Sequence, residues 1–150
     1  MPSILFVCTA NLLRSPIAAA TFKQHLAEPA RKKWRVESAG TWIEPGQAVP
    51  RQLGRLGAKL GVDLAGHVTR SVDELDLAGF DTIVTMEDGH SESLGAEFPH
   101  LRQRIHLLTE LAGTFPSDIP DPAMKDEQGA LTLLREMQAL VIRVAARLVG

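Results

Sequence analysis

The chain has 150 residues, of which 45% are hydrophobic and 23% charged, the composition of an ordinary globular protein. A formal net charge of −2 offers no broad positive surface, so we expect no nucleic-acid partner and no binding to an anionic membrane. The N-terminus runs directly into a short apolar segment, which predicts neither a signal peptide nor a transmembrane helix. A single cysteine cannot form an internal disulfide, and we therefore expect a cytoplasmic protein. The length is usual for one domain, which we expect over residues 1–150.

The first half of the chain shows strand and helix patterns in alternation. Residues 3–8 are a continuous apolar run, typical of a strand buried on both faces. Ser15 and Pro16 predict a helix N-cap followed by proline at the first helical position. The helix that follows has a buried stripe at Ala18, Phe22 and Leu26. A second strand is predicted at 34–38.

The same alternation continues to the C-terminus. A helix is predicted over 50–60, with Leu53, Leu56 and Leu60 facing inward, and residues 71–74 resemble a capping box that opens a short helix. Residues 81–86 and 104–108 are predicted strands. The final helix has the clearest pattern, because its apolar residues are spaced 3, 4, 3 and 4 apart. These residues are Leu134, Met137, Val141, Val144 and Leu148.

Alternating strands and helices predict an α/β fold, here a three-layer α/β/α sandwich with a four-stranded parallel sheet. Ligands of such sheets bind beyond the carboxyl ends of the strands. Cys8 lies at that end of the first predicted strand.

The segment after Cys8 has the pattern cysteine, five residues, arginine, then Ser15. A loop this short must curl between strand and helix, so its backbone N–H groups converge on one point and form an anion site. Asn11 tolerates the left-handed conformation that such a curl requires. The Arg14 guanidinium matches two oxygens of a phosphate, and its positive field favours the nucleophilic thiolate of Cys8. The predicted phosphate-binding loop comprises Thr9, Ala10, Asn11, Leu12, Leu13 and Ser15.

Taken singly, these residues have simpler interpretations. An isolated cysteine after a buried strand is usually a small core residue, and an isolated arginine is usually a surface charge. The combination of apolar strand, C-x5-R-S-P and helix favours the anion site over both.

The segment VCTANLLRSP resembles the signature of the low-molecular-weight protein tyrosine phosphatases. The resemblance extends along the chain through VESAGTW (36–42), HVTR (67–70), FDTIVTM (80–86) and IPDP (119–122). It implies an enzyme that hydrolyses phosphomonoesters through a phosphocysteine intermediate, with no cofactor and no metal. Cys8 is then the nucleophile, Arg14 the phosphate ligand and Asp121 the general acid and base. Without the resemblance, Pro-Asp-Pro at 120–122 is more often a turn before a helix.

The resemblance also implies roles for residues around the loop. Asn11, Ser15, Ser38 and His67 match positions that brace the loop by hydrogen bonds, and Trp42 matches the loop that walls the substrate pocket. Asp118 and Asp126 match no motif position and are expected to face solvent.

Several positions depart from the family pattern. Ala10 and Leu13 replace a frequent glycine and a frequent second cysteine, and Ala123 and Met124 replace aromatic residues near Asp121.

Other functions fit the sequence less well. A thioredoxin-coupled arsenate reductase needs further cysteines, and a cysteine-phosphorylated carrier has no use for Arg14 and Asp121 in these roles. A weakly active phosphate- or phosphotyrosine-binding module and a phosphoarginine phosphatase remain as alternatives. We expect a monomer whose partner is a phosphotyrosine protein or a small phosphoester.

Overall fold

The computed structural model describes residues 1–149, and its sheet has four parallel strands in the order β2-β1-β3-β4. The strands are β1 (Ser3–Cys8), β2 (Arg35–Gly40), β3 (Thr82–Thr85) and β4 (Ile105–Leu107). All four predicted strands are confirmed, although β2 extends two residues past its predicted end. Cys8 pairs with Gly40 and Val7 with Thr85, so the strands end at one common edge of the sheet.

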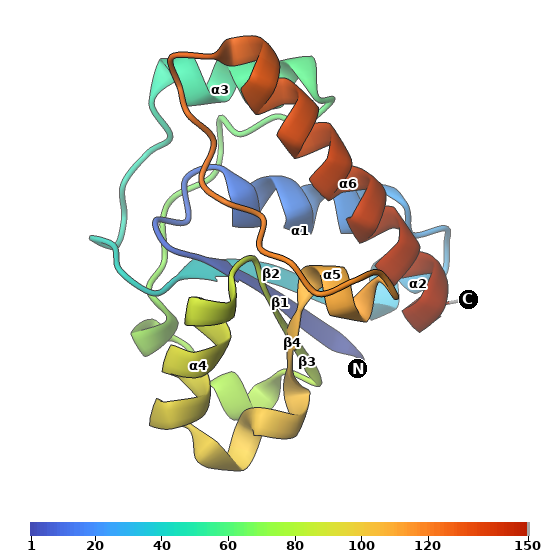
Figure 1. Ribbon diagram of the computed structural model, residues 1–150. Coiled ribbons are helices and arrows are strands. Elements are labelled where there is room, and N and C mark those ends of the chain that lie inside the picture. Colours follow the sequence, from blue (N-terminus) through green and yellow to red (C-terminus); the bar gives the residue numbers. More distant parts are fainter. Residues whose placement is uncertain (150) are drawn as a thin grey trace.

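The helices cover both faces of this sheet (Figure 1). They are α1 (Arg14–Gln24), α2 (Ala30–Lys33), α3 (Arg51–Lys59), α4 (Asp88–Glu97), α5 (Leu108–Leu111) and α6 (Glu127–Val149). Short 3-10 helices span Val72–Glu74, Leu77–Gly79 and Pro99–Arg104. The sequence pattern missed α4, because that helix buries only His90, Leu94 and Gly95 and therefore shows no apolar stripe.

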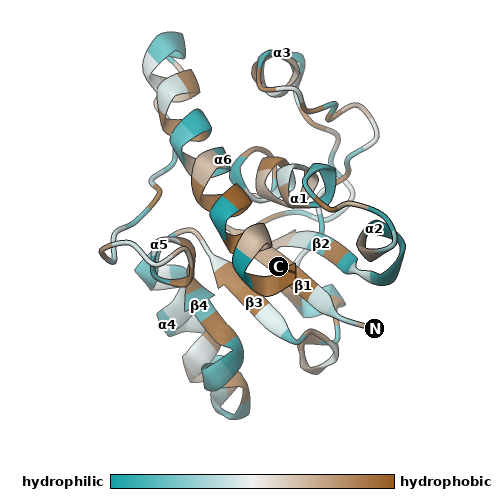
Figure 2. Ribbon diagram, turned by 90° about the vertical axis from the view of Figure 1, so that its right-hand side faces the viewer, coloured by the Kyte–Doolittle hydropathy of each residue, from teal (hydrophilic) through white to brown (hydrophobic). Residues whose placement is uncertain are grey.

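Alternate side chains of β1 enter two separate cores. Ile4, Phe6 and Cys8 pack with α1 and α6 on one face, whereas Leu5 and Val7 pack with α4 and the 3-10 helices on the other. In Figure 2 the hydrophobic strands β1 and β3 lie between these two helical layers. The predicted three-layer α/β/α sandwich is therefore confirmed.

Two details of the helix predictions are wrong. Leu13, not Ser15, is the N-cap of α1, so Ser15 and Pro16 lie inside its first turn. The Ser15 hydroxyl contacts Cys8 and Asn11 instead of capping the helix. Leu148 is 37% exposed, because the last turn of α6 lies at the edge of the core, whereas the other four predicted positions are buried.

The strand order creates a switch point between β1 and β3. From β1 the chain moves outward to β2, then crosses back past β1 to form β3, so the connections leave the sheet in opposite directions. Such a reversal opens a crevice at the carboxyl ends of the two strands. The segment after Cys8 and the segment after β3 therefore meet there. Within residues 1–149, no helix combines the length and apolarity needed to cross a membrane.

Candidate active site

The chain after Cys8 curls back toward the cysteine sulfur. Asn11 has a left-handed backbone with φ of 56°, as predicted from its residue type. The curl brings the Asn11 N–H to 3.3 Å from the Cys8 Sγ, and the Ser15 Oγ lies 3.0 Å from the same sulfur. Cys8 is only 2% exposed. The sulfur thus lies at the bottom of the curl, within reach of two hydrogen-bond donors.

The Asn11 side chain and backbone hold the curl in place. Its amide Nδ2 donates to the Ser15 Oγ at 2.8 Å and to the Ser38 Oγ at 3.0 Å. Its Oδ1 accepts the Arg70 N–H at 2.9 Å, and its carbonyl accepts a hydrogen bond from the His67 Nε2 at 2.7 Å. The structure therefore brings together Asn11, Ser15, Ser38 and His67, the four residues expected to brace the loop.

His67 carries its proton on Nε2, because it donates to a carbonyl oxygen. Burial lowers the pKa of His67, the Asn11 hydrogen bond opposes this, and the Arg70 charge lowers the pKa further. The neutral ring is therefore the form that the fold favours.

Arg14 is a buried cation, 2% exposed, held by groups from two other segments, at Glu87 and at residues 119–121. Its NH1 donates to the Glu87 Oε2 at 2.6 Å and to the Ile119 carbonyl at 2.7 Å. Its Nε lies 3.6 Å from the Asp121 Oδ1, on a side chain that is 75% exposed. A buried charge is tolerated only with such partners, which also fix the plane of the guanidinium.

Glu87 and His90 are site residues that the sequence analysis missed. Glu87 follows β3 and is the N-cap of α4, and its backbone N–H donates to the His90 Nδ1 at 3.2 Å. Because Nδ1 accepts, the neutral ring has its proton on Nε2 and donates it to the Thr9 Oγ1 at 2.8 Å. Burial, and then the nearby Arg14 charge, lower the pKa of His90. The only local signal was a glutamate three residues before a histidine.

Asp118 is exposed, as expected, and it also anchors the segment that carries Asp121. Its Oδ1 accepts the Asp88 N–H at the start of α4 at 2.8 Å. The next residue, Ile119, donates its N–H to the Met86 carbonyl at 2.8 Å. Both contacts tie this segment to the end of β3.

A cavity of about 120 Å³ opens above the cysteine. It is lined by Cys8, Ala10, Leu12, Leu13, Arg14, Leu53, Asp121, Pro122 and Met124. Trp42, expected to wall the pocket, is not in this lining. Its side chain is 85% exposed, although its backbone N–H donates to the Thr9 carbonyl at 3.0 Å. Leu53 and Met124 supply apolar wall instead.

This arrangement places a nucleophilic sulfur, a fixed cation and a carboxyl group around one small cavity. These are the components needed to transfer a phosphoryl group to sulfur, stabilise its oxygens and move a proton at the leaving group. Among residues 1–149, no three His, Cys, Asp or Glu side chains are grouped as metal ligands.

Comparison with known proteins agrees with this geometry. The sequence matches the family described as low molecular weight phosphotyrosine protein phosphatase over residues 3–149. A relative of that name from Gallus gallus is 34% identical over 139 residues, covering 89% of this chain and 87% of the relative. A protein-arginine-phosphatase from Bacillus subtilis (strain 168) is 32% identical over 120 residues, covering 79% of this chain and 78% of that protein.

A solved structure of the low molecular weight protein tyrosine phosphatase from T. tengcongensis superposes with a TM-score of 0.86 at 27% identity. The match covers 99% of this chain and 100% of that one. The fold and the curled cysteine loop thus assign the chain to a class of α/β phosphatases. The chain belongs to the low molecular weight phosphotyrosine protein phosphatase family, which confirms the predicted family and the predicted enzyme class of phosphoric monoester hydrolases.

Gly40, where β2 ends, is a position at which a side chain would displace the loop. A Cβ there would lie 2.5 Å from the Thr9 carbonyl oxygen and 3.1 Å from the Asn11 Cβ. We predict that Gly40→Ala lowers phosphatase activity by about tenfold or more, because small displacements of reacting groups reduce rates steeply. Steady-state kinetics and circular dichroism of Gly40→Ala, with Gly66→Ala as the control in open space, test this. Equal activity of the two variants would contradict it.

The lowered pKa of His90 predicts a pH-dependent stability. An unfolded histidine gains its proton below about pH 6.5, whereas folded His90 resists it, so stability falls as the pH drops from 6.5 toward the lowered folded pKa. His67 contributes in the same direction. We expect His90→Asn to flatten the dependence of melting temperature on pH between about pH 7 and pH 5. The exposed His100→Asn should leave the slope unchanged, and equal slopes for both variants would contradict the assignment.

Proposed function

We propose that this protein is a cysteine-dependent protein-tyrosine phosphatase that works through a phosphocysteine intermediate. The observation that carries the proposal is that Cys8, Arg14 and Asp121 line one cavity of about 120 Å³ at the switch point of the sheet. We further propose that residues 1–150 act as one domain, as a monomer in the cytoplasm, with no nucleic-acid partner and no cofactor.

The first step forms a bond between the Cys8 sulfur and phosphorus. The loop N–H groups from Thr9 to Ser15, at the N-terminus of α1, bind the phosphate oxygens together with the Arg14 guanidinium. The Cys8 thiolate attacks in line while the bond from phosphorus to the ester oxygen breaks. Asp121 gives its proton to that oxygen, so the phenol leaves neutral and Asp121 becomes a carboxylate.

The second step returns the enzyme to its starting state. The Asp121 carboxylate takes a proton from a water molecule as the water attacks phosphorus. The bond from phosphorus to sulfur breaks, phosphate leaves and the Cys8 thiolate is restored. The hydrogen bond from Ser15 supports the sulfur as the leaving group, since the two atoms lie 3.0 Å apart.

The apolar cavity wall supports a phosphotyrosine substrate over a substrate whose phosphorylated side chain carries a further charge. Leu12, Leu53 and Met124 present apolar surface beside the cysteine, which suits an aromatic ring. We propose that the exposed indole of Trp42 extends this wall when substrate is present.

Phosphoarginine is a second candidate substrate. The Bacillus subtilis relative is named a protein-arginine-phosphatase, and here the exposed Asp121 carboxylate is a potential partner for a guanidinium. A phosphatase for phosphoarginine would use the same Cys8 and Arg14.

We predict that the wild-type protein hydrolyses p-nitrophenyl phosphate without added metal, and that Cys8→Ser abolishes turnover. Arg14→Ala should lower kcat by about 10²–10³, since it removes a preorganised donor to the transition state. Asp121→Ala should lower kcat on a phosphotyrosine peptide by about 10²–10⁴, and by less on p-nitrophenyl phosphate, whose leaving group needs less protonation. The exposed Asp73→Ala serves as the control, and an active Cys8→Ser variant would refute the mechanism.

A panel of phosphotyrosine, phosphoserine and phosphoarginine peptides of one sequence identifies the substrate. We expect the highest kcat/KM for phosphotyrosine because of the apolar wall. Leu12→Asn should lower kcat/KM for phosphotyrosine more than for phosphoarginine. A higher kcat/KM for phosphoarginine in the wild type would assign the second candidate function.

A further inference from the structure

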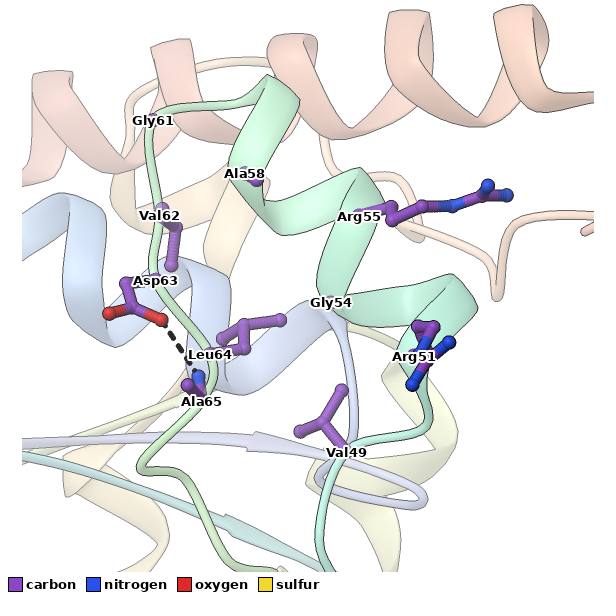
Figure 3. A pocket seen from close by; sticks show the side chains of 10 residues that line it. All are labelled: Val49, Arg51, Gly54, Arg55, Ala58, Gly61, Val62, Asp63, Leu64 and Ala65. Atoms are coloured by element: carbon purple, nitrogen blue, oxygen red, sulfur yellow. Dashed lines mark hydrogen bonds between the residues drawn. The ribbon is translucent and has the colours of Figure 1, made fainter.

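A second and larger depression, of about 720 Å³, lies between α3 and the segment 61–65. In Figure 3 Leu64 points from this segment toward α3, and Val49 lies at one end of the depression. We call this depression the α3 groove. Its lining consists of Val49, Arg51, Gly54, Arg55, Ala58, Gly61, Val62, Asp63, Leu64 and Ala65.

Gly54 leaves the α3 groove open, although a glycine at this position lowers the stability of the helix. Glycine in a helix interior is less favourable than alanine, so it normally has a packing reason. Gly57 has such a reason, because a Cβ there would lie 2.8 Å from the Leu64 Cδ1. At Gly54 nothing lies within 4 Å of a Cβ. The internal packing of the protein therefore does not require this glycine, and its missing side chain leaves room for an occupant of the groove.

The α3 groove has unneutralised positive charge along one side. Arg51, Arg55 and Lys59 recur every fourth residue on a helix with no acidic residue. Lys59 pairs with Glu127 at 3.1 Å, but none of the ion pairs found in residues 1–149 includes Arg51 or Arg55.

The one carboxylate of the groove faces elsewhere. In Figure 3 the Asp63 side chain points away from α3, and its Oδ1 accepts the Ala65 N–H at 2.9 Å. The two arginines thus remain available to an acidic ligand.

Helix α3 contributes to the lining of both the α3 groove and the catalytic cavity. Leu53 lines the cavity above Cys8, and the next residue, Gly54, lines the groove. A peptide whose phosphorylated side chain reaches Cys8 must pass its flanking residues over the neighbouring surface, and α3 is part of that surface.

We propose that the α3 groove binds the segment flanking the phosphorylated residue of a protein substrate, and that this segment carries two acidic residues around one apolar residue. Residues four apart on a helix have Cβ atoms about 5–6 Å apart, and alternate residues of an extended peptide are about 6.6 Å apart. Acidic residues at positions i and i+2 therefore match Arg51 and Arg55. The residue between them points to the opposite side of the peptide, toward the apolar lining that Val49, Ala58 and Ala65 supply. This inference rests on the proposed phosphatase function and specifies its substrate.

The test compares two phosphotyrosine peptides with the wild-type protein. One peptide carries the tripeptide Glu-Leu-Glu both before and after the phosphotyrosine, and each tripeptide begins three residues from it. The other peptide carries Gln-Gly-Gln at the same positions. We expect a kcat/KM about tenfold higher for the acidic peptide, mainly through KM, because two exposed ion pairs and one apolar contact each contribute modestly. Arg51→Ala with Arg55→Ala should remove this advantage while turnover of p-nitrophenyl phosphate stays unchanged.

Two further variants distinguish docking from unfolding and from general charge. Gly54→Leu fills the groove and strengthens the helix, so it should remove the advantage with an equal or higher melting temperature. Lys32→Ala with Lys33→Ala removes two exposed cations on α2, which precedes β2 and lies at the opposite end of the sheet, and it should retain the advantage.

Equal kcat/KM for the two peptides, or an advantage that survives both groove variants, would overturn the docking proposal. Failure to hydrolyse both peptides and p-nitrophenyl phosphate would instead overturn the proposed function.

Discussion

The site depends on one asparagine held in a left-handed conformation. Asn11 has its φ at 56°, and its polar groups bond to residues of α1, β2 and the 67–70 segment. Without this set of bonds, a non-glycine residue in that region would favour a more extended path. The curl sets the Asn11 N–H near the Cys8 sulfur, so the local chemistry follows from the conformation of this one residue.

The guanidinium of Arg14 is fixed by a different means. Its partners come from the end of β3 and from the segment before α6, which are far away in the sequence. They meet at Arg14 because β1 and β3 are neighbours in a parallel sheet and end at the same edge. His90 links the two halves of the site, since it bonds both to Thr9 of the loop and to the backbone of Glu87. Loop and cation therefore form one hydrogen-bonded unit with little freedom to move separately.

Helix α3 connects the chemistry to recognition. Leu53 contributes to the wall beside the cysteine, and Gly54 and Arg55 of the same turns are among the residues that line the larger groove. One short helix thus lines both the cavity above Cys8 and a neighbouring surface that has its own positive charge and apolar side chains. A phosphatase with a cavity of only about 120 Å³ gains selectivity among phosphoproteins mainly from such a surface.

By itself the sequence determined the four strands, the three layers and the order of Cys8, Asn11 and Arg14, because each is a local pattern of apolar spacing or loop chemistry. It indicated the family through the resemblance of its motifs. The tertiary structure decided what those residues contact. Glu87, His90 and Arg70 join the site only because the sheet brings distant segments together, and no spacing in the sequence records that approach. Ser15 was predicted to be an N-cap because Ser-Pro commonly opens a helix, but the curl places its hydroxyl beside the Cys8 sulfur. Trp42 lies outside the cavity lining because where a side chain on a surface loop points depends on the packing around it, which residue type does not encode.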